Sequence, residues 1–191
     1  GFVPFISSVN TSAMTWNGQN VGNVPGTQNG NVLGLSIDYF ENHLYMAGHG
    51  VNTDDICFNG YCTSSPSNEY VGWVGRFSTS LGCKAIAGIT GYGRVEVTDV
   101  VVDDQSSLFV SGVAPSSVFF RDDRGNVKIT RHKTSGGYSD ILVAKYSQSL
   151  STVHWAKRFG GSLTEAFATS LDYNSSIDGV YTGATFTGGP M

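Results

Sequence analysis

The sequence predicts an all-β protein built from repeated units of four antiparallel strands. Its 191 residues include 25 glycines, roughly twice the usual share, and charged residues make up 14% against the usual ~25%. Ser, Thr, Asn and Gly supply most of the polarity, which suits short strands and tight turns better than helices. Apolar and polar residues alternate between turn signals along the chain, without helical periodicity.

The repeat is visible in three similar segments: LSIDYFENHLYMAG at 35–48, VVVDDQSSLFVSG at 100–112 and SLDYNSSIDGVYTG at 170–183. Each reads as an alternating strand, a polar turn and a second apolar strand. The turn aspartates Asp38, Asp103 and Asp172 lie 65 and 69 residues apart. Because the position recurs once per unit, we expect these side chains to accept N–H groups of their own turns rather than to be catalytic.

The other half of each unit repeats as well. VGWVGRFSTSLG at 71–82 matches DILVAKYSQSLS at 140–151 with a shift of 69, which places Leu81 against Leu150. In a looser third copy, SSVNTSAMTWNG at 7–18 places Trp16 where Trp155 stands.

A fixed period of four strands is typical of β-propeller blades. The chain divides into 1–30 as the second half of a blade, 31–94 and 95–163 as whole blades, and 164–191 as the first half of another. These amount to about three blades, whereas propellers use about 4–8. We therefore expect an excerpt of a larger propeller, with several copies closing one ring as the alternative.

Further repeats of the chain or neighbouring subunits are the expected protein partners. They should cover the terminal blades, because open strand edges recruit other strands or aggregate. The 191 residues alone should therefore form oligomers or aggregate.

The segment DILVAKYSQSLSTVHWAKRFGGSLTEAFATSLDYNSSIDGVYTG resembles the SBBP-type β-propeller repeat. The matching residues are, in order, Asp140, Lys145, Tyr146, Trp155, Phe159, Gly160, Gly161, Asp172, Tyr181 and Gly183. The resemblance covers most of the chain but is divergent in 31–95, where the Trp and the Gly-Gly pair are lost. It implies a propeller fold and occurrence in surface or secreted proteins, and it implies no catalytic residues.

The hexapeptide CFNGYC predicts a disulfide across a tight hairpin. Asn59-Gly60 is a strong two-residue turn signal, and it places Cys57 and Cys62 opposite each other within reach of a bond. Two free thiols or a metal site are the alternatives, although zinc would need further ligands that Cys83 alone does not supply. Cys83 is expected to be a small buried thiol, with pairing to a part of the protein outside this sequence as the alternative.

Composition narrows the setting and the partners. Sequons predict N-glycosylation at Asn10 and Asn174, and together with a disulfide they favour an extracellular location. A net charge of -4 without a basic run argues against nucleic acid as a partner. No apolar stretch approaches the ~18–20 residues of a membrane-spanning helix.

Long loops between the second and third strands of each unit are the expected binding face, with packing against neighbouring blades as the alternative. The second loop contains FFRDDRGNVKITR at 119–131, which we expect to project as a hairpin. The candidate binding residues are Asp54, Asp55, Arg121, Asp122, Asp123 and Arg124. Their paired aspartates lack the spacing of a calcium loop, so solvated turn acids are the favoured interpretation.

No catalytic, cofactor-binding or metal-binding residues are predicted. The histidines, His43, His49, His132 and His154, stand in no catalytic or metal-binding motif, and no Gly-x-Ser-x-Gly sequence occurs. The favoured function is a non-enzymatic extracellular or cell-surface propeller segment that serves structure or protein contact. The alternatives are a glycan-binding propeller, with Trp73 or Trp155 stacking on sugar, and an enzyme whose active site lies outside this segment.

Overall fold

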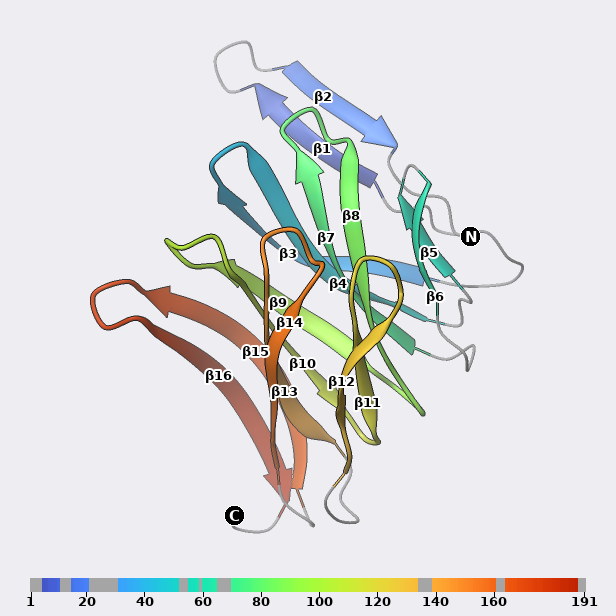
Figure 1. Cartoon of the computed structure of the whole chain (residues 1–191), viewed down its shortest axis with the longest axis vertical. Helices are drawn as coiled ribbons and strands as arrows, with labels where there is room; N and C mark the ends of the chain where they lie inside the picture. Colours follow the sequence, from blue (N-terminus) through green and yellow to red (C-terminus); the bar gives the residue numbers. More distant parts are fainter. Residues whose placement is uncertain are drawn as a thin grey trace.

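The computed structural model describes residues 5–10, 15–20, 31–51, 55–58, 60–64, 70–133, 139–160 and 164–188. In these ranges the backbone forms strands and turns without a helix, and the named strand pairs are antiparallel. The predicted all-β, antiparallel class is therefore confirmed. Figure 1 shows the sheets as layers between β1–β2 and β15–β16, and the described strands close no ring.

Two four-stranded meanders form the middle layers (Figure 1). The first contains β3 (Asn31–Phe40), β4 (His43–Val51), β7 (Tyr70–Ser78) and β8 (Cys83–Gly91). The second contains β9 (Glu96–Val102), β10 (Leu108–Ala114), β13 (Asp140–Tyr146) and β14 (Val153–Phe159). In each meander a strand pairs with the preceding and following strands of that meander, as alternating strands separated by turns allow.

Four hairpins accompany the meanders. The end layers are β1 (Phe5–Asn10) with β2 (Thr15–Asn20), and β15 (Thr164–Asn174) with β16 (Gly179–Gly188). The hairpins β5 (Asp55–Phe58) with β6 (Tyr61–Ser64), and β11 (Val118–Arg121) with β12 (Val127–Arg131), are inserted between the second and third strands of the first and second meander.

The layers repeat their irregularities as well as their strand order. In β3, β9 and β15 one extra residue, Leu35, Thr98 or Thr169, forms a bulge opposite the following strand. Leu81 and Leu150 are both buried at positive φ, 66° and 62°, in the turns after the third strands. The geometry therefore agrees with the alignment of these two leucines.

The alignment of the three turn aspartates needs correction. Counted from the bulges, Asp38 corresponds to Val101 and Asp172, whereas Asp103 corresponds to Asn174. The three hairpin turns differ in length, so aspartates at similar places in the sequence occupy different strand positions.

Only Asp103 holds its own turn in the expected way. Its Oδ1 accepts hydrogen bonds from the backbone N–H groups of Gln105 and Ser107, at 3.0 and 2.6 Å. Asp38 instead accepts a bond from Tyr39 N–H and another, at 2.7 Å, from Val102 N–H in the next sheet.

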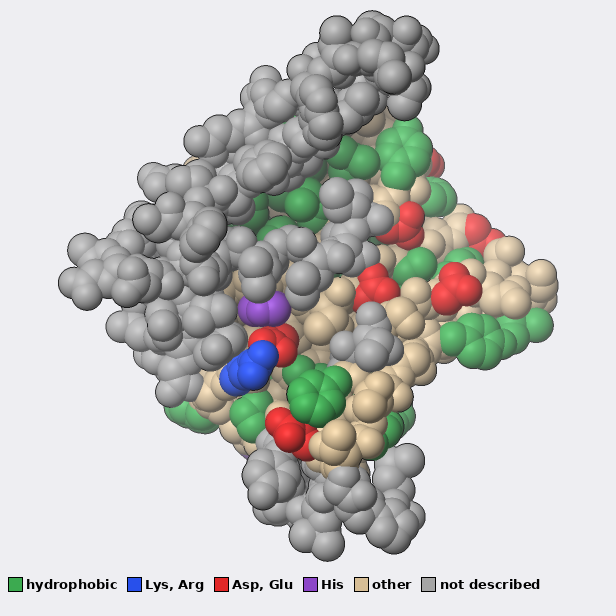
Figure 2. Space-filling model, turned by 180° about the vertical axis from the view of Figure 1, so that it is seen from behind, with side chains coloured by type: hydrophobic (Ala, Val, Ile, Leu, Met, Phe, Trp, Pro, Cys, Tyr) green, Lys and Arg blue, Asp and Glu red, His purple; other side chains and the backbone are tan. Residues whose placement is uncertain are grey.

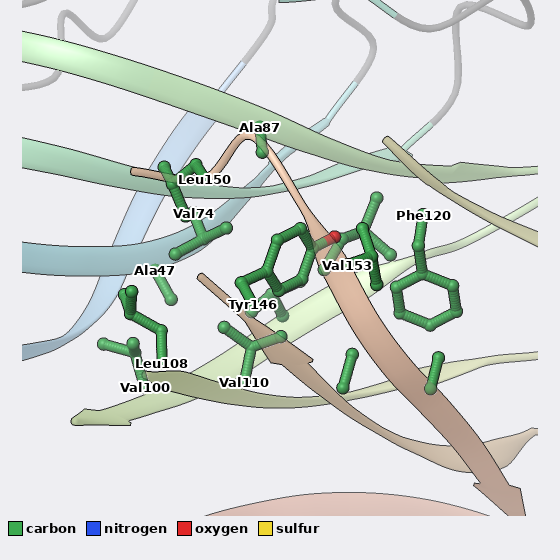
Figure 3. Packing of buried hydrophobic residues seen from close by; sticks show 14 of the residues in the cluster. Ala47, Val74, Ala87, Val100, Leu108, Val110, Phe120, Tyr146, Leu150 and Val153 are labelled. Carbon is green, nitrogen blue, oxygen red and sulfur yellow. The ribbon is translucent and has the colours of Figure 1, made fainter. Parts of the chain in front are cut away.

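The main core lies between the two meanders. Figure 3 shows Val74 and Ala87 from the first sheet and Val110 and Tyr146 from the second, all in one shared apolar layer. The sheets approach closely because Gly72 carries no side chain: a Cβ there would lie 2.5 Å from Val97 Cγ2. Burial of this layer is the main favourable contribution to packing of the sheets.

Both outward faces of the pair of meanders are apolar too. On the first sheet, Trp73 and Phe77 pack against Phe58 of the β5–β6 hairpin, with ring centroids 4.9 and 5.4 Å from the Phe58 ring. A disulfide joins Cys57 and Cys62 across this hairpin, and Cys83 is a buried free thiol. On the second sheet, a further cluster contains residues from β15 and β16.

The β11–β12 hairpin does not project from the molecule. β11 pairs with the free edge of β8, so the hairpin extends the first sheet to six strands although it belongs to the second unit. Val118 and Phe120 are fully buried in the core between the sheets, which explains why the hairpin folds back. The turn is held by a hydrogen bond from Asp123 N–H to Leu150 O, at 3.0 Å.

Arg158 on β14 ties this hairpin to the second sheet. Its guanidinium pairs with Asp140, Nη2 to Oδ2 at 2.6 Å, and both side chains are more than nine-tenths buried. It also donates to the carbonyl oxygens of Ala114 and Ser116, and to that of Arg131 at the end of β12, at 3.5 Å. The close contact leaves no room at Gly160, where a Cβ would lie 2.1 Å from Asp140 Oδ1.

Replacement of Arg158 by methionine is expected to lower the free energy of unfolding by about 3 kcal/mol, because it leaves the Asp140 carboxylate buried without its partner. Urea unfolding followed by circular dichroism measures the change. The double variant Arg158→Met/Asp140→Ala should recover part of the loss, and Arg124→Ala, at an exposed turn position, is the control. Stability of Arg158→Met within about 0.5 kcal/mol of the unsubstituted protein would contradict this account.

Candidate functional site

Of the residues predicted for a binding face, the structure describes the side chains of those in and beside the β11–β12 turn, namely Arg121, Asp122, Asp123 and Arg124. Asp54 lies outside the described residues, and of Asp55 only the backbone, at the start of β5, is described. Arg121 is used internally: its Nε donates to Thr90 Oγ1 at 3.2 Å and its Nη1 to Gly125 O at 2.8 Å. Asp123 is half-buried beside Leu150, and Arg124 is exposed at the hairpin tip.

Asp122 is a turn-forming residue. It is 3% exposed, and its carboxylate accepts bonds from the N–H groups of Arg124 and Asn126 and lies 3.0 Å from Lys128 Nζ. Burial alone would raise the pKa of Asp122, but the hydrogen bonds from Asn126 and Lys128 outweigh it and lower the pKa to about 2. The same turn recurs at Asp103, whose partner is Lys145.

His49, Glu96 and Arg94 form a cluster where the end of β4 meets the start of β9. His49 Nε2 lies 3.6 Å from Glu96 Oε1, and the exposed Arg94 also bonds to Glu96. Figure 2 shows such a contact of purple, red and blue side chains on one face. Burial lowers the pKa of His49, although the Glu96 carboxylate and a backbone hydrogen bond at Val97 oppose the shift. This contact joins β4 to β9, and within the described ranges no three His, Cys, Asp or Glu side chains could hold a metal.

The two tryptophans proposed for sugar stacking are used in packing. Trp73 is 1% exposed and lies against Phe58. Trp155 is half-buried, packs on the cluster under β15 and β16, and lies 5.9 Å from Phe109 between ring centroids. Trp73 therefore offers no free ring face of the kind that a sugar needs.

The outer face of β15–β16 is the surface that stands out. Phe167 and Tyr181 are 43% and 52% exposed. Phe167 pairs with Thr185 and Tyr181 with Asp172, and paired residues point to the same side of a sheet, so their side chains line the face turned away from β9–β14.

The repeat shows what such a face carries elsewhere. Tyr181 occupies the position of Tyr45 in β4 and Phe109 in β10, which are 0% and 5% exposed because the next layer covers them. The sequence alignment placed these three aromatic residues at one position and named Tyr181 in the SBBP-type pattern, but it did not predict that Tyr181 is exposed. The structure supplies the difference, because in its described part no layer lies beyond the third copy.

Comparisons with known proteins do not assign the chain to a family. No protein-family model matches it, and a search of curated proteins finds no match. The likeness to SBBP-type repeats therefore stays a prediction from the sequence. Among the described residues no helix is long and apolar enough to cross a membrane.

The low pKa of Asp122 predicts acid-dependent stability. The folded pKa of about 2 lies below the unfolded value of ~3.9, so the stabilisation is present above about pH 4 and is lost as pH falls towards 2. Asp122→Asn should lower the free energy of unfolding by about 2 kcal/mol at pH 7 and by much less at pH 2.

Urea unfolding at pH 7, 4 and 2.5 measures this dependence. Glu41→Gln, at an exposed carboxylate, is the control and should change stability little at any of these pH values. A constant difference between Asp122→Asn and the unsubstituted protein over the whole range would refute the explanation.

Proposed function

We propose that this chain is a non-enzymatic, extracellular or cell-surface scaffold that acts through protein contact, as a segment of a β-propeller. Its main contact surface is the outer face of β15–β16. The observation that carries the proposal is the exposure of Tyr181 at a position where Tyr45 and Phe109 are covered by a following sheet.

A polar group on the same face supports the proposal. Asp38 and Asp99 each accept a backbone N–H from the first strand of the next layer, from Val102 and from Leu171. Asp172 occupies the position of Asp38 on an outward face, and its side chain is exposed. The face thus offers both an apolar contact and an acceptor to a further layer.

The way in which the layers meet supports the propeller arrangement. The hydrogen bonds made by Asp38 and Asp99 lie along β3, β9 and β15, the first strands of their layers. The last strands of the two meanders, β8 and β14, do not pair with each other. The β11–β12 hairpin lies between them, because β11 pairs with β8 and Arg131 of β12 donates to Ala156 O in β14. Sheets that converge at their first strands and diverge at their last strands have the relation of neighbouring blades.

Two features support the proposed extracellular location: the disulfide and an exposed glycosylation sequon. The Cys57–Cys62 disulfide persists best in an oxidising compartment. Asn174, the last residue of β15, is exposed and begins its sequon just before the turn to β16, while the side chain of Asn10 lies outside the described part.

The contact surface is tested by self-association. An uncovered apolar face should make the 191-residue chain associate with rising concentration, and Phe167→Ser/Tyr181→Ser should weaken association at least about tenfold. Ile177→Ser removes an apolar side chain that is even more exposed, at 62%, from the nearby turn and is the matched control. Sedimentation analysis measures the masses. A cooperative monomer at every concentration, with or without the substitutions, would rule out this surface.

The secretory route is tested by glycosylation. When the chain is expressed with a leader peptide in a eukaryotic secretory system, we expect a glycan at Asn174, because the residue is exposed and its turn is accessible. Mass spectrometry detects the glycan. Ser176→Ala removes the sequon but keeps Asn174, and it should abolish the modification. An unmodified Asn174 in the secreted chain would count against an extracellular scaffold.

A further inference from the structure

The outer edge of β16 resembles a strand edge that is paired elsewhere in the molecule. In the described structure β16 pairs with β15 on one side and with no strand on the other. Its counterparts β4 and β10 each have a second partner, β7 and β13. The strands β7 and β13 therefore show which kind of strand pairs at this position in the other two copies.

The two precedents agree residue by residue. In β7 the residues opposite β4 are Trp73, Val74, Gly75, Arg76 and Phe77. In β13 the residues opposite β10 are Leu142, Val143, Ala144, Lys145 and Tyr146. The shared pattern is a large apolar residue, valine, a small residue, a cation and an aromatic residue. The same register on β16 places the cation opposite Tyr181 and the aromatic residue opposite Val180.

Hydrogen-bond alternation identifies the donors on the open edge. Asp103 N–H bonds to Ser107 O at the turn between β9 and β10. Antiparallel pairs alternate from there, so the N–H groups of Leu108, Val110 and Gly112 point towards β13. The counterparts in β16 are Val180, Thr182 and Ala184. Thr182 is exposed, although its counterpart Val110 is 2% exposed.

Charge favours a cation at the fourth position of the pattern, opposite Tyr181. Lys145 Nζ lies 4.8 Å from the centroid of the Phe109 ring, its cross-strand neighbour. On the outer face of β16, Tyr181 lies opposite Asp172, as Tyr45 lies opposite Asp38, and the cation that completes the Tyr45 row is Arg76. A lysine or arginine set against Tyr181 would therefore lie near an exposed carboxylate.

We infer that the edge of β16 binds an extended strand from another repeat unit with the third-strand pattern of this chain: large apolar, valine, small, cation, aromatic. The strand pairs antiparallel to β16, with its cation against Tyr181 and near Asp172. This inference deepens the proposed scaffold function and rests on it, but it concerns the edge of β16, whereas the proposed contact surface is its face.

The test supplies the strand in the same polypeptide. A copy of residues 139–160 is appended after Met191 through a short Gly/Ser linker, which gives a millimolar effective concentration. Amide hydrogen exchange of Val180, Thr182 and Ala184 is compared with that of a fusion whose appended segment is scrambled. We expect exchange at these three positions to slow at least about tenfold.

Two pairs of variants locate the effect. Thr182→Pro removes the central donor and should abolish the added protection at Val180 and Ala184, whereas Thr182→Val keeps the donor and the protection. Lys145→Glu in the appended copy should reduce protection, and Lys145→Arg should preserve it. Equal exchange in the ordered and the scrambled fusion overturns the inference, even if Phe167→Ser/Tyr181→Ser weakens association as the scaffold function predicts.

Discussion

The two four-stranded meanders are apolar on both faces, and most of the architecture follows from that constraint. A sheet with one wet face alternates apolar and polar residues, but β8 and β10 are buried along almost their whole length. Such strands need a cover on each side. The layers, the disulfide-linked hairpin over Trp73 and the close approach at Gly72 all supply this cover.

Polar groups then decide how the layers are aligned. Apolar contact is non-directional, so it does not select one offset between two sheets. The carboxylates of Asp38 and Asp99 bond to single backbone N–H groups in the next layer, and Arg131 Nε in β12 donates to Ala156 O in β14 of the other sheet. Polar contacts that are at least half-buried are costly when misaligned, and they favour one arrangement of the layers over others.

Local sequence patterns predicted much of this fold, but they did not predict which strands pair over long distances in the sequence. Alternation and turn residues located the four-stranded units and the Asn59-Gly60 hairpin, because those features depend on neighbours in sequence. They did not predict that β11 pairs with β8, since a sequence marks a hairpin without naming the edge that accepts it. They also missed the role of Asp38, whose partner lies in the next sheet, and the exposure of Tyr181, which depends on what covers it.

The placement of the β11–β12 hairpin has a consequence for the order in which the chain can fold. The first meander ends at Gly91 in sequence, yet its free edge at β8 is paired by β11, which begins at Val118. During synthesis from the N-terminus, β8 therefore waits with an open edge while the first half of the second unit is made. Neighbouring units are thus interlocked rather than autonomous, and a cut between Gly91 and Glu96 would separate two modules in sequence but leave each incomplete in space.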